Sequence, residues 1–343
     1  MTENEYLLTV AIPTYNGSRT IGAMLDILLP QVTKEVEVII SDNCSTDNTP
    51  DIIKKYVEKF PFIKYVQNKR NINADGNFLQ CMRMAKGKFV MLTSDDDIVI
   101  EGAIEKITNF LKKHLDMSLG YMEALAFKDK YVSVERCHGY KFLTPVEESF
   151  VTTDKDIFLK YCQRLFGFTS VHIWSTERIK QIENPEQYFG TYFLQGYINV
   201  LCSNRPDDIL GVIKGPCIGV GEYGIIGNFD VAEVEGIYNH RMIEFAIANG
   251  YPKQRMEKFY IWKAIFLCRN SIIRERAVDL HKTSIKNIFK ATIKYPSAWI
   301  KLYPFLLVPA PICKLALRII RKKQGRKFLS YVNRPTSNND GTA

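Results

Sequence analysis

Residues 89–100 read FVMLTSDDDIVI, an apolar run that passes directly into Ser94 and three consecutive aspartates, Asp95–Asp97. Carboxylates this close raise one another's pKa and repel, unless a cation or hydrogen-bond donors compensate. A helix N-cap with acidic first-turn residues would be the ordinary explanation, but one cap does not require three aspartates. The stretch therefore favours a divalent metal ion that holds an anionic ligand.

The chain around this stretch alternates between apolar strands and amphipathic helices. Strands are expected at 7–12, 36–40, 63–68 and 88–93, and helices at 19–29, from 49, after 77 and at 102–114. Alternation at this spacing predicts an α/β fold, with βαβ units and a mainly parallel, Rossmann-like sheet. Ligands bind beyond the carboxyl ends of the strands in such sheets. The polar loops at 14–16, 42–43 and 95–97 all follow strands, so we expect them to converge on one edge.

The sequence contains neither GxGxxG nor GxxxxGK[ST]. A dinucleotide-dependent oxidoreductase or a P-loop enzyme would therefore lack its phosphate-binding loop. A sheet that binds a nucleotide without these loops needs another way to neutralise the phosphates, and a metal held by carboxylates supplies one.

Composition is that of an ordinary folded protein, with 343 residues, 46% hydrophobic and 24% charged. The N-terminal stretch MTENEYLLTVAIPTYNG shows no basic segment followed by a long apolar run, so no secretory signal is expected. The eight cysteines are scattered without metal-ligand spacing, which predicts reduced core residues and argues against a disulfide framework or a zinc site.

The net charge of +9 is concentrated near the C-terminus. Residues 281–330 hold twelve Lys or Arg and no Asp or Glu, which leaves 34 basic and 37 acidic residues elsewhere, a balance of −3. The apolar piece LYPFLLVPAPICKLAL within this segment is broken by prolines and a lysine, too short to span a bilayer. An interfacial segment on an anionic membrane leaflet is the favoured interpretation. Nucleic-acid binding and a plain solvated helix are the alternatives.

Four ordered motifs resemble those of family 2 glycosyltransferases with the GT-A fold: AIPTYNG (11–17), VIISDNCSTDNTPDII (38–53), RNINADGNF (70–78) and GKFVMLTSDDD (87–97). The similarity is greatest to bacterial enzymes of O-antigen, capsule and other surface-polysaccharide synthesis, the abequosyltransferase-like group included. It is strong over about residues 5–110 and weak beyond.

The resemblance implies roles for particular residues. Those expected to bind the nucleotide-sugar are Pro13, Thr14, Tyr15, Asp42, Asp75, Asn77, Asp95 and Asp96, and Asp97 is expected to bind Mn²⁺ or Mg²⁺. Pyrophosphate leaving groups develop negative charge, which a hard divalent cation with oxygen ligands stabilises. Asp42, Asp75 and Asn77 also suit ordinary turns, and Tyr15 suits simple packing.

The catalytic base is harder to find. An inverting member of the family needs a carboxylate to deprotonate the acceptor, and Thr191 and Tyr192 stand about where an acidic pair is expected. Glu186 is the candidate base, with a solvated loop carboxylate as the alternative. Without a base the enzyme would be retaining or would use another group.

The expected organisation is a GT-A domain at 1–235, with a nucleotide-binding half at 1–115 and an acceptor half at 116–235. A helical, basic, membrane-associating region is expected at 236–330, and a disordered tail at 331–343. The expected function is transfer of a sugar from a nucleotide-diphosphate donor to a lipid-linked or oligosaccharide acceptor. The enzyme would be cytoplasmic and peripheral at the inner face of the cell membrane, with no nucleic-acid partner.

Two other functions stay open: a metal-dependent sugar nucleotidyltransferase and a non-catalytic scaffold for glycan synthesis. The donor base and sugar, the acceptor, the anomeric outcome and the oligomeric state cannot be read from the sequence, because a fold does not fix a substrate.

Overall fold

The computed structural model describes residues 6–127, 145–221, 230–280 and 282–319. The chain forms two compact units: residues 1–225 with 238–260, and residues 226–237 with 261–343. The tail expected at 331–343, the last part of the basic segment and Cys137 lie outside the described residues. The seven cysteines that the structure does describe are free thiols.

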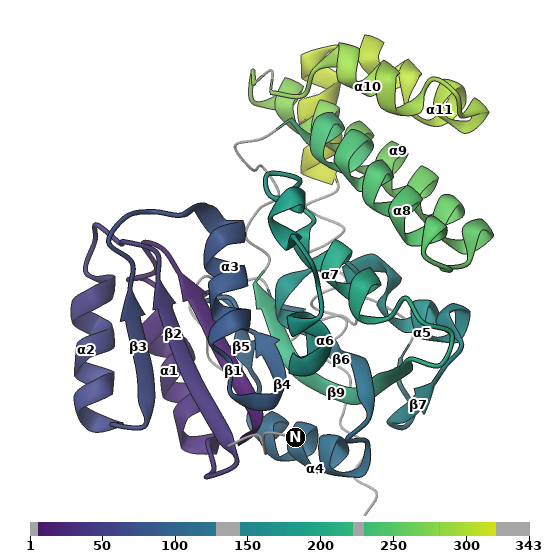
Figure 1. The fold of residues 1–343 in the computed structure, drawn as a ribbon. Coiled ribbons are helices and arrows are strands. Elements are labelled where there is room, and N and C mark those ends of the chain that lie inside the picture. The colour runs from purple at the N-terminus through teal and green to yellow at the C-terminus, as the bar shows by residue number, and fades with distance from the viewer. Residues whose placement is uncertain (1–5, 128–144, 222–229, 281, 320–343) are drawn as a thin grey trace, which may run out of the picture. The chain divides into compact units, whose positions relative to one another are not determined.

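Four parallel strands form the N-terminal half of the sheet in the order β3-β2-β1-β4 (Figure 1). Their bounds are β1 Tyr6–Thr14, β2 Val36–Asp42, β3 Ile63–Gln67 and β4 Gly87–Leu92. β2 is buried along its whole length, and only the first two residues of β1 are partly exposed. Unbroken burial is what continuous apolar runs predict for central parallel strands with helices on both faces.

The helices between these strands follow the expected apolar spacing. They are α1 Ile21–Leu28, α2 Thr49–Lys59, α3 Asn73–Met84 and α4 Ala103–Lys113. α2 begins at Thr49 with Pro50 in its first turn, where the missing proline N–H costs no hydrogen bond. α1 and α2 pack together on one face, while α3 crosses the other (Figure 1).

The second half of the sheet is mixed. β8 (His172–Ser175) pairs antiparallel with β4 and with β6 (Met117–Phe127), and β6 pairs in parallel with β9 (Ile209–Gly221). The short strands β5 (Ile98–Val99) and β7 (Phe150–Thr152) both pair antiparallel with β9. A parallel half continued by a mixed half is the GT-A architecture that the sequence predicts.

Two middle segments differ from the sequence interpretation. The aromatic-rich run 187–202 has the composition of one helix, but it forms the end of a short 3₁₀ helix, η5 (Pro185–Tyr188), a loop, and then α7 (Leu194–Cys202). The loop breaks the helix because Gly190 and Tyr192 have positive φ angles of 73° and 61°. The run DDILGVIKGPCIGV (207–220) suggests a pair of strands, but it lies in the single strand β9. The remaining helices of this unit are α5 Lys155–Cys162, α6 Thr176–Lys180, α8 Asn239–Ala248 and the start of α9 Lys253–Ala277.

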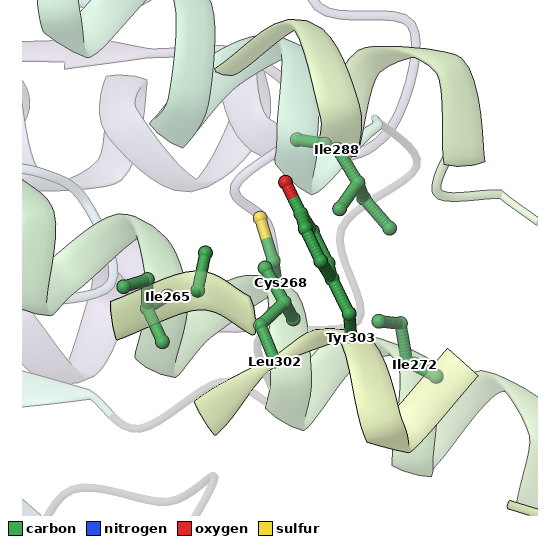
Figure 2. Close-up of a cluster of buried hydrophobic side chains, with 8 residues drawn as sticks. Ile265, Cys268, Ile272, Ile288, Leu302 and Tyr303 are labelled. Atoms are coloured by element: carbon green, nitrogen blue, oxygen red, sulfur yellow. The ribbon is translucent and has the colours of Figure 1, made fainter. Parts of the chain in front are cut away.

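The second unit is helical. It holds the π-helix η6 (Ala232–Tyr238) up to residue 237, α9 from residue 261, α10 (Ile285–Thr292), α11 (Pro296–Lys301) and the 3₁₀ helix η7 (Tyr303–Leu307). Its own apolar core joins α9, α10 and η7, and Figure 2 shows Ile265, Cys268, Ile272, Ile288, Leu302 and Tyr303 in it. In the part of the chain that the structure describes, no single helix is long and apolar enough to cross a membrane. Pro296–Leu307 and Ala310–Ile319 meet that criterion as a pair, bent by 113°.

Candidate active site

The carboxyl ends of β1 and β2 lie side by side, in a register that pairs Pro13 with Ser41 and Thr14 with Asp42. The pairing extends one residue further, because the N–H of Asn43 donates to the carbonyl of Thr14 at 2.9 Å. Pro13, Thr14 and Asp42 are all buried. Two of the three polar loops expected to converge therefore meet at this edge of the sheet.

The aspartate turn reaches the same edge from β4. The N–H of Thr93 donates to the carbonyl of Ala11 at 2.9 Å, which carries the β1–β4 pairing past the end of the strand. Asp95–Asp97 follow as a turn before β5, and the next helix, α4, begins only at Ala103 with Gly102 as its N-cap. The three aspartates are therefore not a helix cap, and the ordinary explanation for them does not apply.

Asp95 reaches across to β1, where the hydroxyl of Thr14 donates to its carboxylate. Burial raises the pKa of the Asp95 carboxyl to about 6; the charge of Asp96 adds to this rise, and the Thr14 hydrogen bond opposes it. A cation placed beside this carboxylate would relieve both the burial cost and the repulsion.

Gly17 makes the Thr14–Asp95 contact possible. A β-carbon at Gly17 would overlap the carboxylate of Asp95 and would lie 2.7 Å from Oγ1 of Thr14. These two atoms bond to each other, so a β-carbon at this position would have to push them apart. In the sequence, Gly17 ends the motif AIPTYNG directly after a strand, and that position alone does not indicate the contact.

Asp97 is the most buried of the three aspartates, with 3% of its surface exposed. The hydroxyl of Ser170 donates to its Oδ2 at 2.6 Å and accepts from the N–H of Ser94 at 3.0 Å. The hydroxyl of Ser94 in turn donates to Asp96. Ser170 thus fixes the turn at both ends, and it was not found from the sequence, because it lies 73 residues further on in the irregular middle of the chain.

Asp42 is held by the loop that follows it. Its Oδ1 accepts from the N–H of Ser45 at 2.9 Å, and its Oδ2 accepts from the hydroxyl of Tyr65 at 3.1 Å. Burial and the charge of Asp42 raise the pKa of Tyr65, so this phenol stays a donor. Each carboxylate oxygen keeps a second lone pair, but Asp42 has no exposed surface, so a ligand would reach it only after the loop that follows β2 moves.

Tyr15 lies on the loop that follows β1, and 49% of its surface is exposed. The next residue, Asn16, has a φ angle of 54° and ties this loop to the one after β2. Its N–H donates to Ser45 Oγ at 2.9 Å, and its side-chain oxygen accepts from the N–H of Thr46 at 2.8 Å. Tyr15 is therefore an exposed ring on a braced loop rather than a core aromatic.

Helix α3 contributes Asp75 and Asn77 in different ways. Asn77 is buried and locks α3 to β2: its Oδ1 accepts from the hydroxyl of Ser41 at 2.6 Å, and its Nδ2 donates to the Ser41 carbonyl at 2.9 Å. Asp75 is partly exposed and accepts from the N–H of Gly190 at 2.7 Å, while burial raises its pKa. Asp75 therefore links the helix to the loop before α7.

Glu186 lies on η5 and is exposed to solvent. Its carboxylate forms an ion pair with Arg83 of α3, at 2.6 Å between Oε1 and Nη2. Hydrogen bonds from its own backbone N–H and from Arg83 lower its pKa. The structure thus links Glu186 to α3 rather than to the three aspartates, and a carboxylate with a lowered pKa is a weaker base.

Two other titratable side chains, Asp208 and His240, have structural partners. Asp208 is buried, bonded to Arg178 at 2.9 Å and to the hydroxyl of Ser118 at 2.9 Å. His240 lies one helical turn from Glu244, at 3.4 Å, and its ring packs against Tyr260. Neither has a contact with the aspartate turn among those that the structure gives for the described residues.

The loop before α7 presents Tyr192 to solvent. The residue has 57% of its surface exposed and a φ angle of 61°, a conformation that is unusual and costly for a bulky side chain. Its ring lies 6.1 Å from that of Tyr238. Tyr192 lies two residues after Gly190, whose N–H bonds to Asp75. Backbone strain of this kind is found most often in functional loops.

Asp97 is the carboxylate that the resemblance assigns to a divalent ion. Among the described residues, no group of three or more His, Cys, Asp or Glu side chains is arranged to hold a metal by itself. Mg²⁺ and Mn²⁺ at phosphate sites usually take one or two protein carboxylates and complete their shell with phosphate and water oxygens. The aspartate turn fits that mode of binding and does not fit an all-protein metal cage.

The parallel sheet, the convergent loops and the carboxylate turn together define an α/β protein of the GT-A class. Residues 9–142 match the profile described as Glycosyl transferase family 2. This segment, about two fifths of the chain, therefore resembles the family 2 glycosyltransferases, as its motifs predict.

Three similar proteins illustrate the relationship. An abequosyltransferase of Salmonella typhimurium is 26% identical over 221 residues, 62% of this chain and 66% of that protein. A glucosyltransferase of Escherichia coli, named for UDP-glucose and an N-acetylglucosamine-diphosphoundecaprenol, is 28% identical over 144 residues, 41% of this chain and 56% of that one. The structure of residues 1–349 of Staphylococcus aureus TarS with UDP-GlcNAc superposes with a TM-score of 0.56 at 16% identity, over 83% of this chain and 79% of that one. The chain thus spans about two thirds or less of the length of the Salmonella and Escherichia coli proteins. The superposition on TarS supports the fold alone.

Proposed function

We propose that this protein transfers a sugar from a nucleoside-diphosphate donor to an acceptor hydroxyl. The observation that carries the proposal is the aspartate turn at the carboxyl edge of β4, where Thr14 and Ser170 hold two of the three carboxylates in place. Three adjacent carboxylates destabilise a folded protein unless a positively charged or donor-rich ligand compensates their charge. The match of residues 9–142 to the glycosyltransferase profile supports a metal-bound nucleotide-sugar as that ligand.

The donor would lie along the edge formed by β1, β2 and the aspartate turn. Pro13, Thr14 and Tyr15 would border the base and ribose, with the exposed Tyr15 ring available for stacking. Asp42 would accept a hydrogen bond from the base. Four candidates would lie around the ribose and the donor sugar: Asp75, Asn77, Asp95 and Asp96. Asn77 would act by holding α3 in place.

Asp97 would hold Mn²⁺ or Mg²⁺. Such an ion, when bound, supplies positive charge that stabilises the departing diphosphate. The protein's own contribution is to fix the carboxylates beforehand: Ser170 orients Asp97, and Thr14 with Gly17 positions Asp95. Carboxylates fixed in this way need little reorganisation when the donor binds.

Glu186 is our candidate for the base that deprotonates the acceptor. To act, its carboxylate would have to exchange the ion pair with Arg83 for a hydrogen bond to the acceptor hydroxyl. The exposed pair contributes little to stability, so this exchange would be inexpensive. The neighbouring Tyr192 would offer an apolar ring face to the acceptor sugar.

The acceptor would be a lipid-linked or oligosaccharide intermediate of a bacterial surface polysaccharide. The names of the Salmonella and Escherichia coli relatives support this choice. The basic segment 281–330 would hold the enzyme at the inner, cytoplasmic face of the cell membrane, close to such an acceptor.

The test is a calorimetric titration of the purified protein with UDP, GDP, CDP and dTDP, each with and without Mn²⁺. We expect one nucleotide to bind in a metal-dependent way and Asp97→Ala to abolish that binding. Asp116→Ala is the matched control, because this exposed aspartate precedes β6, at the opposite edge of the sheet. The same nucleotide, linked to its sugars, is then assayed for metal-dependent release of the diphosphate. Absence of nucleotide binding, or binding that ignores Asp97, contradicts the proposal; binding without sugar transfer would indicate a scaffold.

A further inference from the structure

The second unit exposes many large apolar side chains although its own core is complete. Ile300 and Leu307 have 78% and 83% of their surfaces exposed, and Trp299 is exposed by more than half. The core of this unit is formed by other residues of the same helices, among them Ile288 and Leu302 (Figure 2). The exposed side chains are therefore additional to the core.

Helix α10 shows this arrangement most clearly. Ile288, Ala291 and Thr292 are buried and face the core of the unit. Ile285, Phe289 and Ile293, spaced by four residues, are exposed and form a second apolar strip. A surface helix of a water-soluble unit normally turns charged and polar residues outward, so a second apolar strip needs a partner of its own.

A row of lysines runs beside the exposed apolar strip. Lys286, Lys290 and Lys294 each follow one of its residues, and all three are exposed. The strip and the lysines are adjacent on the helix surface, because successive residues differ by about 100°. Residues 281–330 contain no aspartate or glutamate that could neutralise these lysines from within the segment.

Two aromatic contacts connect α10 with the apolar residues of α11. The Tyr303 ring lies 4.7 Å from that of Phe289 and 5.0 Å from that of Trp299. The α10 strip therefore continues through Tyr303 to Trp299 and its exposed neighbour Ile300. We call the exposed residues Ile285, Phe289, Ile293, Trp299 and Ile300, with Lys286, Lys290 and Lys294, the apolar-basic face.

The geometry of the following helices favours a flat orientation. Pro296–Leu307 and Ala310–Ile319 together have the composition of a membrane span but are bent by 113°. Neither piece is long enough alone to cross a hydrocarbon core of about 30 Å. Their exposed side chains include Leu307, Ile312 and Leu315. Apolar helices that are too short to span, with lysines beside them, suit the boundary between headgroups and acyl chains.

We propose that the apolar-basic face binds in the plane of a bilayer that contains anionic phospholipids. The five apolar side chains enter the acyl boundary, and the three lysines contact the lipid phosphates. A polynucleotide would satisfy the lysines but would leave the aliphatic side chains in water, and for this reason we choose a lipid surface. The proposal rests on the membrane attachment proposed above, assigns it to particular side chains, and does not depend on glycosyl transfer.

The test is co-sedimentation of the full-length protein with vesicles of phosphatidylcholine, with and without phosphatidylglycerol. We expect binding that requires phosphatidylglycerol and weakens in salt. Reversing the basic row (Lys286→Glu, Lys290→Glu and Lys294→Glu together) should weaken binding by about 100-fold or more, because each lysine near the surface contributes about fivefold. Replacing the apolar residues (Phe289→Ser, Trp299→Ser and Ile300→Asn together) should reduce binding about as strongly at both low and high salt.

A charge-matched control separates the face from net charge. Lys55→Glu, Lys59→Glu and Lys64→Glu change the same number of exposed lysines in the first unit, and this variant should keep binding within about threefold of wild type. Circular dichroism and thermal melting of each variant check folding, and the fluorescence of Trp299 should shift to the blue on anionic vesicles. Nucleotide titration of the same proteins reports the proposed donor site independently.

The proposal fails if wild-type protein does not bind anionic vesicles, or if the control variant loses binding as completely as the basic-row variant. It also fails if single-stranded DNA binds the basic row while the apolar variant binds vesicles normally. Loss of nucleotide binding alone would count against the proposed activity and not against this surface.

Discussion

Gly17 and Asp95 are in such close contact that a β-carbon on the glycine would overlap the carboxylate of the aspartate. Gly17→Ala should therefore push Asp95 away from Thr14. If Asp95 lies at the proposed donor site, the affinity for nucleotide with Mn²⁺ should fall about tenfold or more. Calorimetric titration measures the change.

Gly22→Ala is the control for that substitution. The nearest atom to its β-carbon would be Oη of Tyr56 at 3.6 Å, which is ordinary contact. Alanine is also favoured over glycine within α1, so this variant should gain about 0.5–1 kcal/mol of stability and bind nucleotide normally. Equal affinities of the two variants would show that Asp95 does not contribute to the donor site.

Ser170 should act as a positioning residue for Asp97. Ser170→Ala removes the hydrogen bond that Asp97 accepts and leaves the N–H of Ser94 without its partner. Loss of a residue that orients a metal ligand typically lowers metal affinity or activity by about 10–100-fold. We expect the Mn²⁺ concentration for half-maximal activity to rise, which a titration of the rate with Mn²⁺ measures.

The control is another buried serine, Ser203, whose hydroxyl bonds to the carbonyl of Asn199 and lies 2.6 Å from Oη of Tyr251. Ser203→Ala should cost about 1–2 kcal/mol in stability and leave the Mn²⁺ dependence unchanged. If Ser170→Ala behaves in the same way, its role is structural.

His172 should make the fold sensitive to acid. Its ring is completely buried on β8, its Nδ1 lies 3.1 Å from the Phe168 carbonyl, and its Nε2 has no hydrogen-bond partner among the described residues. Burial lowers its pKa from 6.5 to about 4. A lowered histidine pKa means that the folded state resists protonation, so its contribution to stability is complete above pH 6.5 and is lost as the pH falls towards 4.

The loss at about pH 5 should be about 2 kcal/mol, since one pKa unit corresponds to about 1.4 kcal/mol. Urea unfolding between neutral pH and about pH 5 measures it. His172→Gln cannot protonate, so it should be less stable at neutral pH but should lose less stability on acidification. Parallel pH curves for the two proteins would show that other groups cause the acid sensitivity.

The sequence predicts the first half of the molecule well because its signals are local. Apolar runs of strand length, Pro50 in the first turn of α2 and the aspartates after β4 each determine structure close to themselves. Parallel strands then bring Thr14, Asp42 and the aspartate turn together, since they align their carboxyl ends. The site could therefore be anticipated as a set of converging loops.

The residues that were missed act over long sequence distances or through an absent side chain. Ser170 contacts Asp97 from 73 residues away, and no periodicity in the sequence indicates that contact. Gly17 matters because it has no β-carbon, which leaves room for the Asp95 carboxylate. The sequence alone does not show that Asp95 lies there. The aromatic segment 187–202 looked like one helix because its composition suits a helix, whereas positive φ angles at Gly190 and Tyr192 interrupt it.

Glu186 and Arg83 give the last prediction, which concerns the catalytic base. If Glu186 is the base, Glu186→Gln should lower kcat by about 100-fold or more and leave nucleotide binding unchanged. Arg83→Met keeps the carboxylate and removes the cation that lowers its pKa. Since a base must be deprotonated, the acidic limb of the kcat/KM profile should then move to higher pH, while the rate at alkaline pH stays close to wild type. Steady-state rates across pH, with the donor that the titration identifies, distinguish the two variants. A normal kcat for Glu186→Gln would exclude this residue and direct the search to the other side chains around the Tyr192 loop.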